Sequence, residues 1–180
     1  MNFNYSGYDL NFIQSETCHD DSAHLANYIY KFYSPVTHHH YIVRAEYHQA
    51  EVFTIKFYCK KHRNSDYKYS LVVNKGDLGN IMMTCAKVIP LLLQSFPTAS
   101  FAFAAARTYD PKSKKLENLY CTQRYRLYCH IIPIKFGQQT FSHYNNDEIS
   151  SYLLYNNRSV HSINEIQEMF KITYNGTDWL

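Results

Sequence analysis

The stretch HHHYIVRAEYH, residues 38–48, decides the fold because its side chains alternate between apolar and polar. Tyr41, Val43, Ala45 and Tyr47 fall on one side of an extended chain, and the polar side chains fall on the other. This period of two is typical of a strand with one face in the core. Residues 51–60 (EVFTIKFYCK) and 66–74 (DYKYSLVVN) repeat the pattern. Because short polar connectors join the three stretches, we expect a three-stranded antiparallel meander.

The rest of the chain alternates between helix and strand signals. We expect a strand near Asn2–Leu10 and a helix over about 20–31, where Asp20, Asp21 or Ser22 can serve as the N-cap. The later elements are a helix over 76–96 kinked at Pro90, an apolar middle strand over 99–107, a helix over 116–137, strands at 139–144 and 151–156, and a helix beginning at Ser162 with a Ser162–Glu165 capping box. The predicted order is β-α-βββ-α-β-α-ββ-α. This defines an α+β fold with a mixed, mostly antiparallel sheet and helices packed on it, in one domain over residues 1–180.

Composition limits the possible function classes. The formal charge of +3 is small, and 17% of the residues are aromatic, with 18 tyrosines. Five cysteines without a paired short spacing argue against a disulfide framework. The N-terminus lacks a signal-peptide pattern, and the longest apolar run is interrupted by Lys87 and Pro90. We therefore expect a compact cytoplasmic protein without a membrane segment.

The predicted helix over 116–137 contains Arg124, Arg126, Cys121 and Cys129. At 100° per residue the two arginines flank the apolar stripe on opposite sides, so they cannot form one phosphate clamp. The two cysteines are about 12 Å apart along a helix at 1.5 Å per residue, which is too far for a disulfide or a shared ion. We predict no metal site. His38, His39 and His40 are expected at the surface, and Cys59 and Cys85 as buried thiols.

The order of elements over roughly residues 20–156 resembles the GNAT family of acyl-CoA N-acyltransferases. In that family a turn of the kind [RQ]xxGx[GA] before a helix holds the cofactor pyrophosphate with backbone N–H groups. The resemblance places this turn at Asn74-Lys75-Gly76-Asp77-Leu78-Gly79-Asn80, with Gly76, Leu78, Gly79 and Asn80 as cofactor-binding residues. It also implies that Tyr125 or Tyr128 protonates the leaving thiolate, and that the cofactor is acetyl-CoA or another acyl-CoA.

Three functional hypotheses follow. Because the glycine spacing differs from the family pattern and Asp77 adds a carboxylate, the first is a binding or regulatory protein without turnover or cofactor, which contacts a protein partner through its tyrosine-rich surface. The second is the acyl-CoA-dependent N-acyltransferase. The third is a nucleic-acid-binding module, whose contacts are the outward side chains Arg44, Lys56, Tyr58, Lys60 and Lys68.

Overall fold

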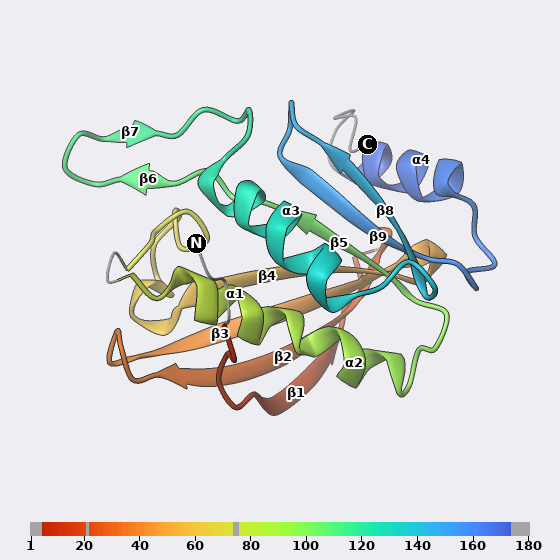
Figure 1. Ribbon diagram of the computed structural model, residues 1–180, viewed down its shortest axis with the longest axis horizontal. Helices are drawn as coiled ribbons and strands as arrows, with labels where there is room; N and C mark the ends of the chain where they lie inside the picture. Colours follow the sequence, from red (N-terminus) through yellow and green to blue (C-terminus); the bar gives the residue numbers. More distant parts are fainter. Residues whose placement is uncertain (1–4, 21, 74–75, 174–180) are drawn as a thin grey trace.

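A computed structural model describes residues 5–20, 22–73 and 76–173 of the chain and shows a seven-stranded sheet with helices on both faces (Figure 1). The strands, in sheet order, are β1 (Asn11–Thr17), β2 (His24–Ser34), β3 (His39–His48), β4 (Val52–Cys59), β5 (Ser100–Ala104), β9 (Ser151–Asn156) and β8 (Phe141–Asn146). Neighbouring strands are antiparallel except β4 and β5, which are parallel. The predicted α+β class with a mostly antiparallel sheet is confirmed.

Four α-helices and three small elements complete the described fold. They are α1 (Leu78–Ala86), α2 (Val88–Leu93), α3 (Gln123–Lys135), α4 (Ile163–Thr173), the 3-10 turns η1 (Gln49–Glu51) and η2 (Lys60–His62), and a hairpin of β6 (Tyr109–Asp110) and β7 (Lys115–Leu116). Phe53, Phe101 and Leu154 pack in one core with α1, α2 and α3. Val52, Ala102 and Leu153 pack with α4 in a second core. Because neighbouring strand residues point to opposite faces, α4 covers the face opposite the other helices.

The helix predicted over 20–31 is wrong, because this segment contains β2. Its aromatic side chains alternate, with Tyr30 opposite Val43 and Phe32 opposite Tyr41 across the β2–β3 ladder, and both are buried. Aromatic side chains suit a half-buried pleated surface. Asp20, proposed as an N-cap, instead accepts hydrogen bonds from the backbone N–H and hydroxyl of Ser22 in a turn.

The three-stranded meander predicted over residues 38–74 is shifted toward the N-terminus. It consists of β2, β3 and β4, and its third predicted strand, over 66–74, is not formed in the described residues. Residues 66–70 turn instead of extending, with Lys68 N–H donating to Ser65 and Ser70 N–H to Tyr67, and residues 71–73 form no strand. Asn74 lies outside the described residues. The strand expected at 2–10 is also wrong where it is described, since residues 5–10 form no strand and β1 begins at Asn11.

Two helix boundaries also differ from prediction. The helix break lies at Lys87, before Pro90, because proline cannot donate the N–H that would bond to the Ala86 carbonyl four residues earlier. Helix α3 begins at Gln123, after Thr122, whose hydroxyl accepts from Tyr125 N–H. Leu116 belongs to the β6–β7 hairpin. The middle strand β5, the β8–β9 pair and the reciprocal bonds of the Ser162–Glu165 capping box are confirmed.

Candidate functional site

A cavity opens where β4 and β5 separate. The two parallel strands are paired only at Val52 with Ser100, Phe53 with Phe101 and Thr54 with Ala102. Strand β4 then continues to Cys59 and β5 ends at Ala104, and between them lies a cavity of about 480 Å³. Ligand crevices of sheets with parallel strands commonly lie beyond the carboxyl ends of those strands. This cleft is therefore the primary candidate site.

The walls of the cleft are mostly apolar and come from β4, the end of β5, α3 and two loops. The lining residues are Ile55, Lys56, Phe57, Tyr69, Ala104, Ala105, Ala106, Arg107, Leu119, Arg124, Tyr128, Ile149 and Ser151. Helix α3 lies over β5 (Figure 1), and the ring of Tyr128 contacts that of Phe103 at a centroid distance of 4.8 Å. The three consecutive alanines fill little of the space between the strands and the helix, which keeps the cleft open.

Arg124 is buried in this wall, with only 3% of its surface exposed. Its Nη1 donates to the carbonyl of Tyr69, and its Nη2 donates to that of Leu71 at 3.4 Å. The guanidinium also lies 5.0 Å from the centre of the Phe57 ring. Arg124 Nε has no hydrogen-bond partner. Burial lowers the pKa of this guanidinium, but a guanidinium stays protonated at neutral pH.

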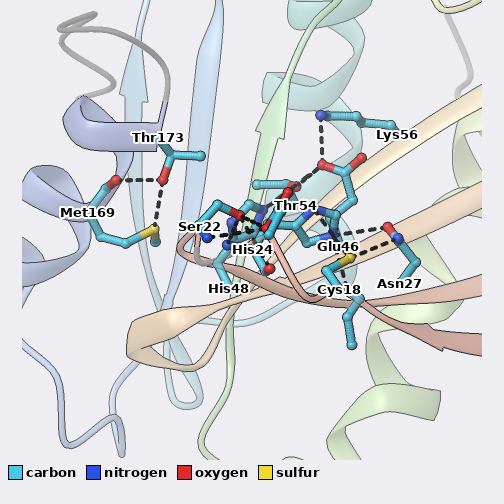
Figure 2. Close-up of polar contacts among 12 residues, drawn as sticks. Cys18, Ser22, His24, Asn27, Glu46, His48, Thr54, Lys56, Met169 and Thr173 are labelled. Carbon is cyan, nitrogen blue, oxygen red and sulfur yellow. Dashed lines mark hydrogen bonds and ion pairs between the residues drawn. The ribbon is translucent and has the colours of Figure 1, made fainter.

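A polar cluster extends from Lys56 along the sheet (Figure 2). Lys56 Nζ lies 2.7 Å from Glu46 Oε2. Burial raises the pKa of the Glu46 carboxyl, but the charge and hydrogen bond of Lys56, together with His24 and His48, hold that pKa below its ordinary value. The Thr54 hydroxyl donates to Glu46 and therefore accepts from Nε2 of His48. Burial lowers the pKa of His48 to about 4, so its imidazole is neutral at pH 7.

The same cluster contains Cys18, His24 and Asn27 (Figure 2). His24 Nε2 lies 3.0 Å from Asn27 Oδ1 and 3.1 Å from the Ala26 carbonyl, so this nitrogen carries the proton. Cys18 Sγ is nearly equidistant from the two ring nitrogens, at 3.8 and 3.7 Å. The thiol is thus not aligned with the lone pair of Nδ1, and burial raises its pKa. This geometry does not activate the sulfur.

The two predicted catalytic tyrosines have different environments. Tyr125 donates its hydroxyl proton to Asp147 Oδ1 at 2.5 Å and accepts from Asn145 Nδ2 at 3.0 Å. It does not line the cleft. Tyr128 lines the cleft, and burial raises its pKa, so its hydroxyl stays protonated at neutral pH. Of the two, Tyr128 is placed to meet a ligand.

The predicted cofactor-binding residues border a second cavity, of about 780 Å³. Gly76, Leu78 and Gly79 line it together with Tyr5, and Lys112 of the β6–β7 hairpin lies in its wall. The ring of Tyr5 occupies the space where a side chain at Gly79 would begin, with ring carbons 2.2 to 2.5 Å from an added Cβ. Asn80 instead donates to Asp77 through its side chain.

Asp77 is buried at the start of α1, where its carboxylate accepts from side chains. Its Oδ2 accepts from the Ser34 hydroxyl at 2.5 Å, and its Oδ1 accepts from the Tyr8 hydroxyl at 2.6 Å. No side-chain hydrogen bond caps the helix from this residue. The carboxylate is therefore a structural acceptor that joins α1 to β2 and to the segment before β1.

Of the residues predicted to contact nucleic acid, Arg44, Lys56 and Tyr58 lie in β3 and β4 on the sheet face opposite α1 and α3, and Lys60 and Lys68 lie outside the strands. Lys56, Tyr58 and Lys68 have local partners. Lys56 pairs with Glu46. The Lys68 ammonium lies 5.4 Å from the centre of the Tyr58 ring, and Tyr69 meets that ring edge to face at 5.4 Å. Arg44 Nε is buried without a hydrogen bond, and Lys60 is exposed in η2. These contacts occupy part of the surface that a nucleic acid would need, and the hypothesis stays a prediction.

Other sequence features have simple placements. Cys59 and Cys85 are buried free thiols, as predicted. Over residues 5–20, 22–73 and 76–173, no group of three or more His, Cys, Asp or Glu side chains is arranged to hold a metal ion. Within the same ranges, no helix has the length and apolar character needed to cross a membrane. Comparisons with known protein families, curated proteins and solved structures give no match to this chain.

The cleft itself was not predicted from the sequence. Helical periodicity placed Arg124 on the flank of a longer helix, and Tyr69, Arg107 and the alanine run were not predicted as site residues. The run Ala104–Ala106 at the end of an apolar strand was the available signal, because small side chains there leave space next to the sheet. The separation of β4 from β5 had no signal in either strand.

Proposed function

We propose that this protein binds an acyl-CoA in the cleft between β4 and β5 and transfers its acyl group to an amine. The observation that carries the proposal is the short parallel pairing of these strands, which ends at Thr54 and Ala102 and leaves the cavity beyond. In the GNAT family, which the chain resembles, the strands at this position splay to admit the pantetheine arm of the cofactor. The strand order, with one parallel pair inside an antiparallel sheet, supports the same reading.

The second cavity is the proposed binding place of the cofactor's phosphates. Gly76, Leu78 and Gly79 bring the start of α1 to its wall, and helix N-termini attract anions through free N–H groups. Lys112 adds a positive charge. One short segment, residues 69–73, contributes to the walls of both cavities: Tyr69 lines the first, and Val72 and Val73 line the second. A bound cofactor would therefore pass beside residues 69–73.

In this proposal Tyr128 is the general acid. The amine nitrogen attacks the thioester carbonyl, a C–N bond forms, and the C–S bond breaks. Tyr128 gives its proton to the leaving sulfur, and the proton lost by the amine restores the hydroxyl. The raised pKa of Tyr128 keeps its proton available until the thiolate leaves. Acyl-CoA supplies the activated acyl group.

Calorimetric titration with acetyl-CoA and with CoA tests the proposal. Micromolar binding that is weakened about tenfold or more by Lys112→Glu supports it, because that change removes one charge-assisted contact worth roughly 1.5–3 kcal/mol. Lys115→Glu in the same hairpin is the matched control, because Lys115 does not line the cavity. If no heat of binding is measured at high concentrations of acetyl-CoA and CoA, the protein does not bind this cofactor and the proposal is wrong.

A second candidate function is binding to a protein partner without turnover, which the edge strand β1 favours. All seven of its residues are exposed, including Phe12 at 55% and Ile13 at 49%. Within the described sheet β1 pairs only with β2, so its outer edge can accept another strand. Sedimentation velocity at low and high salt tests this through self-association: a concentration-dependent complex that survives salt and is lost in Ile13→Lys supports it, and a monomer throughout counts against strand pairing between copies.

A further inference from the structure

The charges around the β4–β5 cleft are unbalanced. Three of its lining residues, Lys56, Arg107 and Arg124, are cationic and none is acidic. Two carboxylates lie close to these cations. Glu46 is paired with Lys56, and Glu117 accepts from the backbone N–H groups of Thr108 at 2.9 Å and Gln123 at 2.8 Å. Because Glu46 neutralises Lys56, the positive charge inside these largely apolar walls comes from Arg107 and Arg124.

Arg124 is the deepest of these cations. It is 3% exposed, and no carboxylate of the described residues forms an ion pair with it. Two of its five N–H groups donate to backbone carbonyls, but neutral acceptors do not cancel the charge. Burying an unpaired charge costs several kcal/mol even after relaxation. Its Nε–H has no acceptor and is itself buried, which adds to this cost.

We propose that the cleft binds a small organic carboxylate, whose acidic group is held by the positive charge of Arg124 and Arg107 in the wall and whose apolar body lies against Phe57, Leu119 and Ile149. The cavity of about 480 Å³ falls within the size range typical of small-molecule sites, roughly 300–1,000 Å³. The inference rests on ligand binding in the cleft, as the proposed function does, and it is independent of acyl transfer.

A carboxylate fits better than a phosphate ester. The walls of the cleft are mostly apolar, and burying a dianion there costs more than burying a monoanion. A cation beside apolar surface therefore suits a monoanion with an alkyl or aromatic body. Phenyl phosphate therefore serves as the comparison ligand.

The test compares charged and neutral ligands of the same shape. The wild-type protein is titrated by calorimetry with butyrate, hexanoate, octanoate and phenylacetate, and with the corresponding amides. We expect at least one carboxylate to bind, at least tenfold more tightly than its amide and more tightly than phenyl phosphate. Equal affinity for acid and amide, binding of phenyl phosphate alone, or no binding by any carboxylate overturns the proposal.

Two variants locate the binding. Arg124→Gln removes the charge and is expected to abolish the preference for acid over amide, whereas Arg126→Gln, an exposed arginine two residues on, is expected to retain it. Because Arg124→Gln also loses contacts to residues 69–71 and can fail to fold, Ala106→Trp provides a second route by filling the cleft. Val160→Trp, at a position 82% exposed, is its control. Retained acid preference in folded Arg124→Gln, or undiminished binding in Ala106→Trp, overturns the assignment.

The outcomes separate this inference from the acyltransferase proposal. Carboxylate binding without CoA binding leaves the inference standing and removes acyl transfer. CoA binding without a preference for carboxylates over amides overturns the inference and leaves the acyltransferase proposal standing.

Discussion

Lys56 and Glu46 form an ion pair across β3 and β4, with 2.7 Å between Nζ and Oε2, at the wall of the cleft. The pair orients Lys56 and neutralises its charge at this wall of the site. It also ties that lysine to a buried polar cluster with Thr54 and His48. The acid stability of the fold and the charge of the cleft are therefore linked through one carboxylate.

The lowered pKa of Glu46 predicts how stability responds to acid. A carboxyl with a lower pKa in the folded state contributes stability that is present above its ordinary pKa of 4.5 and is lost as pH falls through the folded value. We expect the free energy of unfolding to fall below pH 4.5, and less so in Glu46→Gln. Urea denaturation from pH 7 to pH 3 measures this. Equal slopes in both proteins would contradict the prediction.

His48 predicts a second pH dependence, at higher pH. Its pKa is lowered to about 4 by burial, so the unfolded chain binds a proton near pH 6.5 that the folded chain does not bind. Stability should therefore decrease as pH falls from 6.5 toward 4. Replacing His48 with Gln, which keeps a donor for Thr54, should flatten this interval. The same denaturation series gives the answer, and a wild-type profile that is level from pH 6.5 to 4.5 would refute it.

The tyrosines of α3 are expected to respond differently to loss of their hydroxyls. Tyr125→Phe removes the bonds with Asp147 and Asn145, and should lower the free energy of unfolding by about 1 kcal/mol, the net value of a typical hydrogen bond. Tyr128→Phe should leave the fold intact and lower kcat for acyl transfer by about 10²-fold or more, as for loss of a general acid. Thermal unfolding and turnover assays on both variants separate the roles. Equal effects on activity would remove Tyr128 as the general acid.

Asp77 is expected to be structural. Ser34, Tyr8 and Asn80 all donate to its carboxylate, and an amide oxygen cannot accept from all three as well. Asp77→Asn should therefore lower the free energy of unfolding by about 2 kcal/mol, the cost of leaving buried donors unpaired. Chemical denaturation of Asp77→Asn beside Asn80→Ala measures the effect. A change below 0.5 kcal/mol, roughly the lower limit for one hydrogen bond, would show that the network is not stabilising.

Elements with one dominant local signal were predictable. The alternation in residues 39–48 and 52–59 gave β3 and β4, and the Ser162–Glu165 pair gave the start of α4. Segments with two competing signals were not. Residues 20–31 contain both helix-capping residues and alternating aromatic residues. The segment forms a strand because Tyr30 and Phe32 are buried when β2 pairs with β3.

The candidate site was only partly predictable. Tyr128 and Lys56 were named from sequence for different reasons, and the fold brings both to one cavity. Arg124 was judged by helical periodicity, which places it on a flank and says nothing of the loop that covers it. Its burial depends on the carbonyls of Tyr69 and Leu71, more than 50 residues earlier in the chain.

The sequence by itself determined the α+β class, the half-buried strands and the apolar middle strand, because local periodicity records which side chains leave water. Only the tertiary structure decided that β4 and β5 pair over three residues and then separate, and that a buried arginine lies in the resulting cleft. Strand separation and charge burial are set by contacts between distant segments. No local pattern of side chains records them.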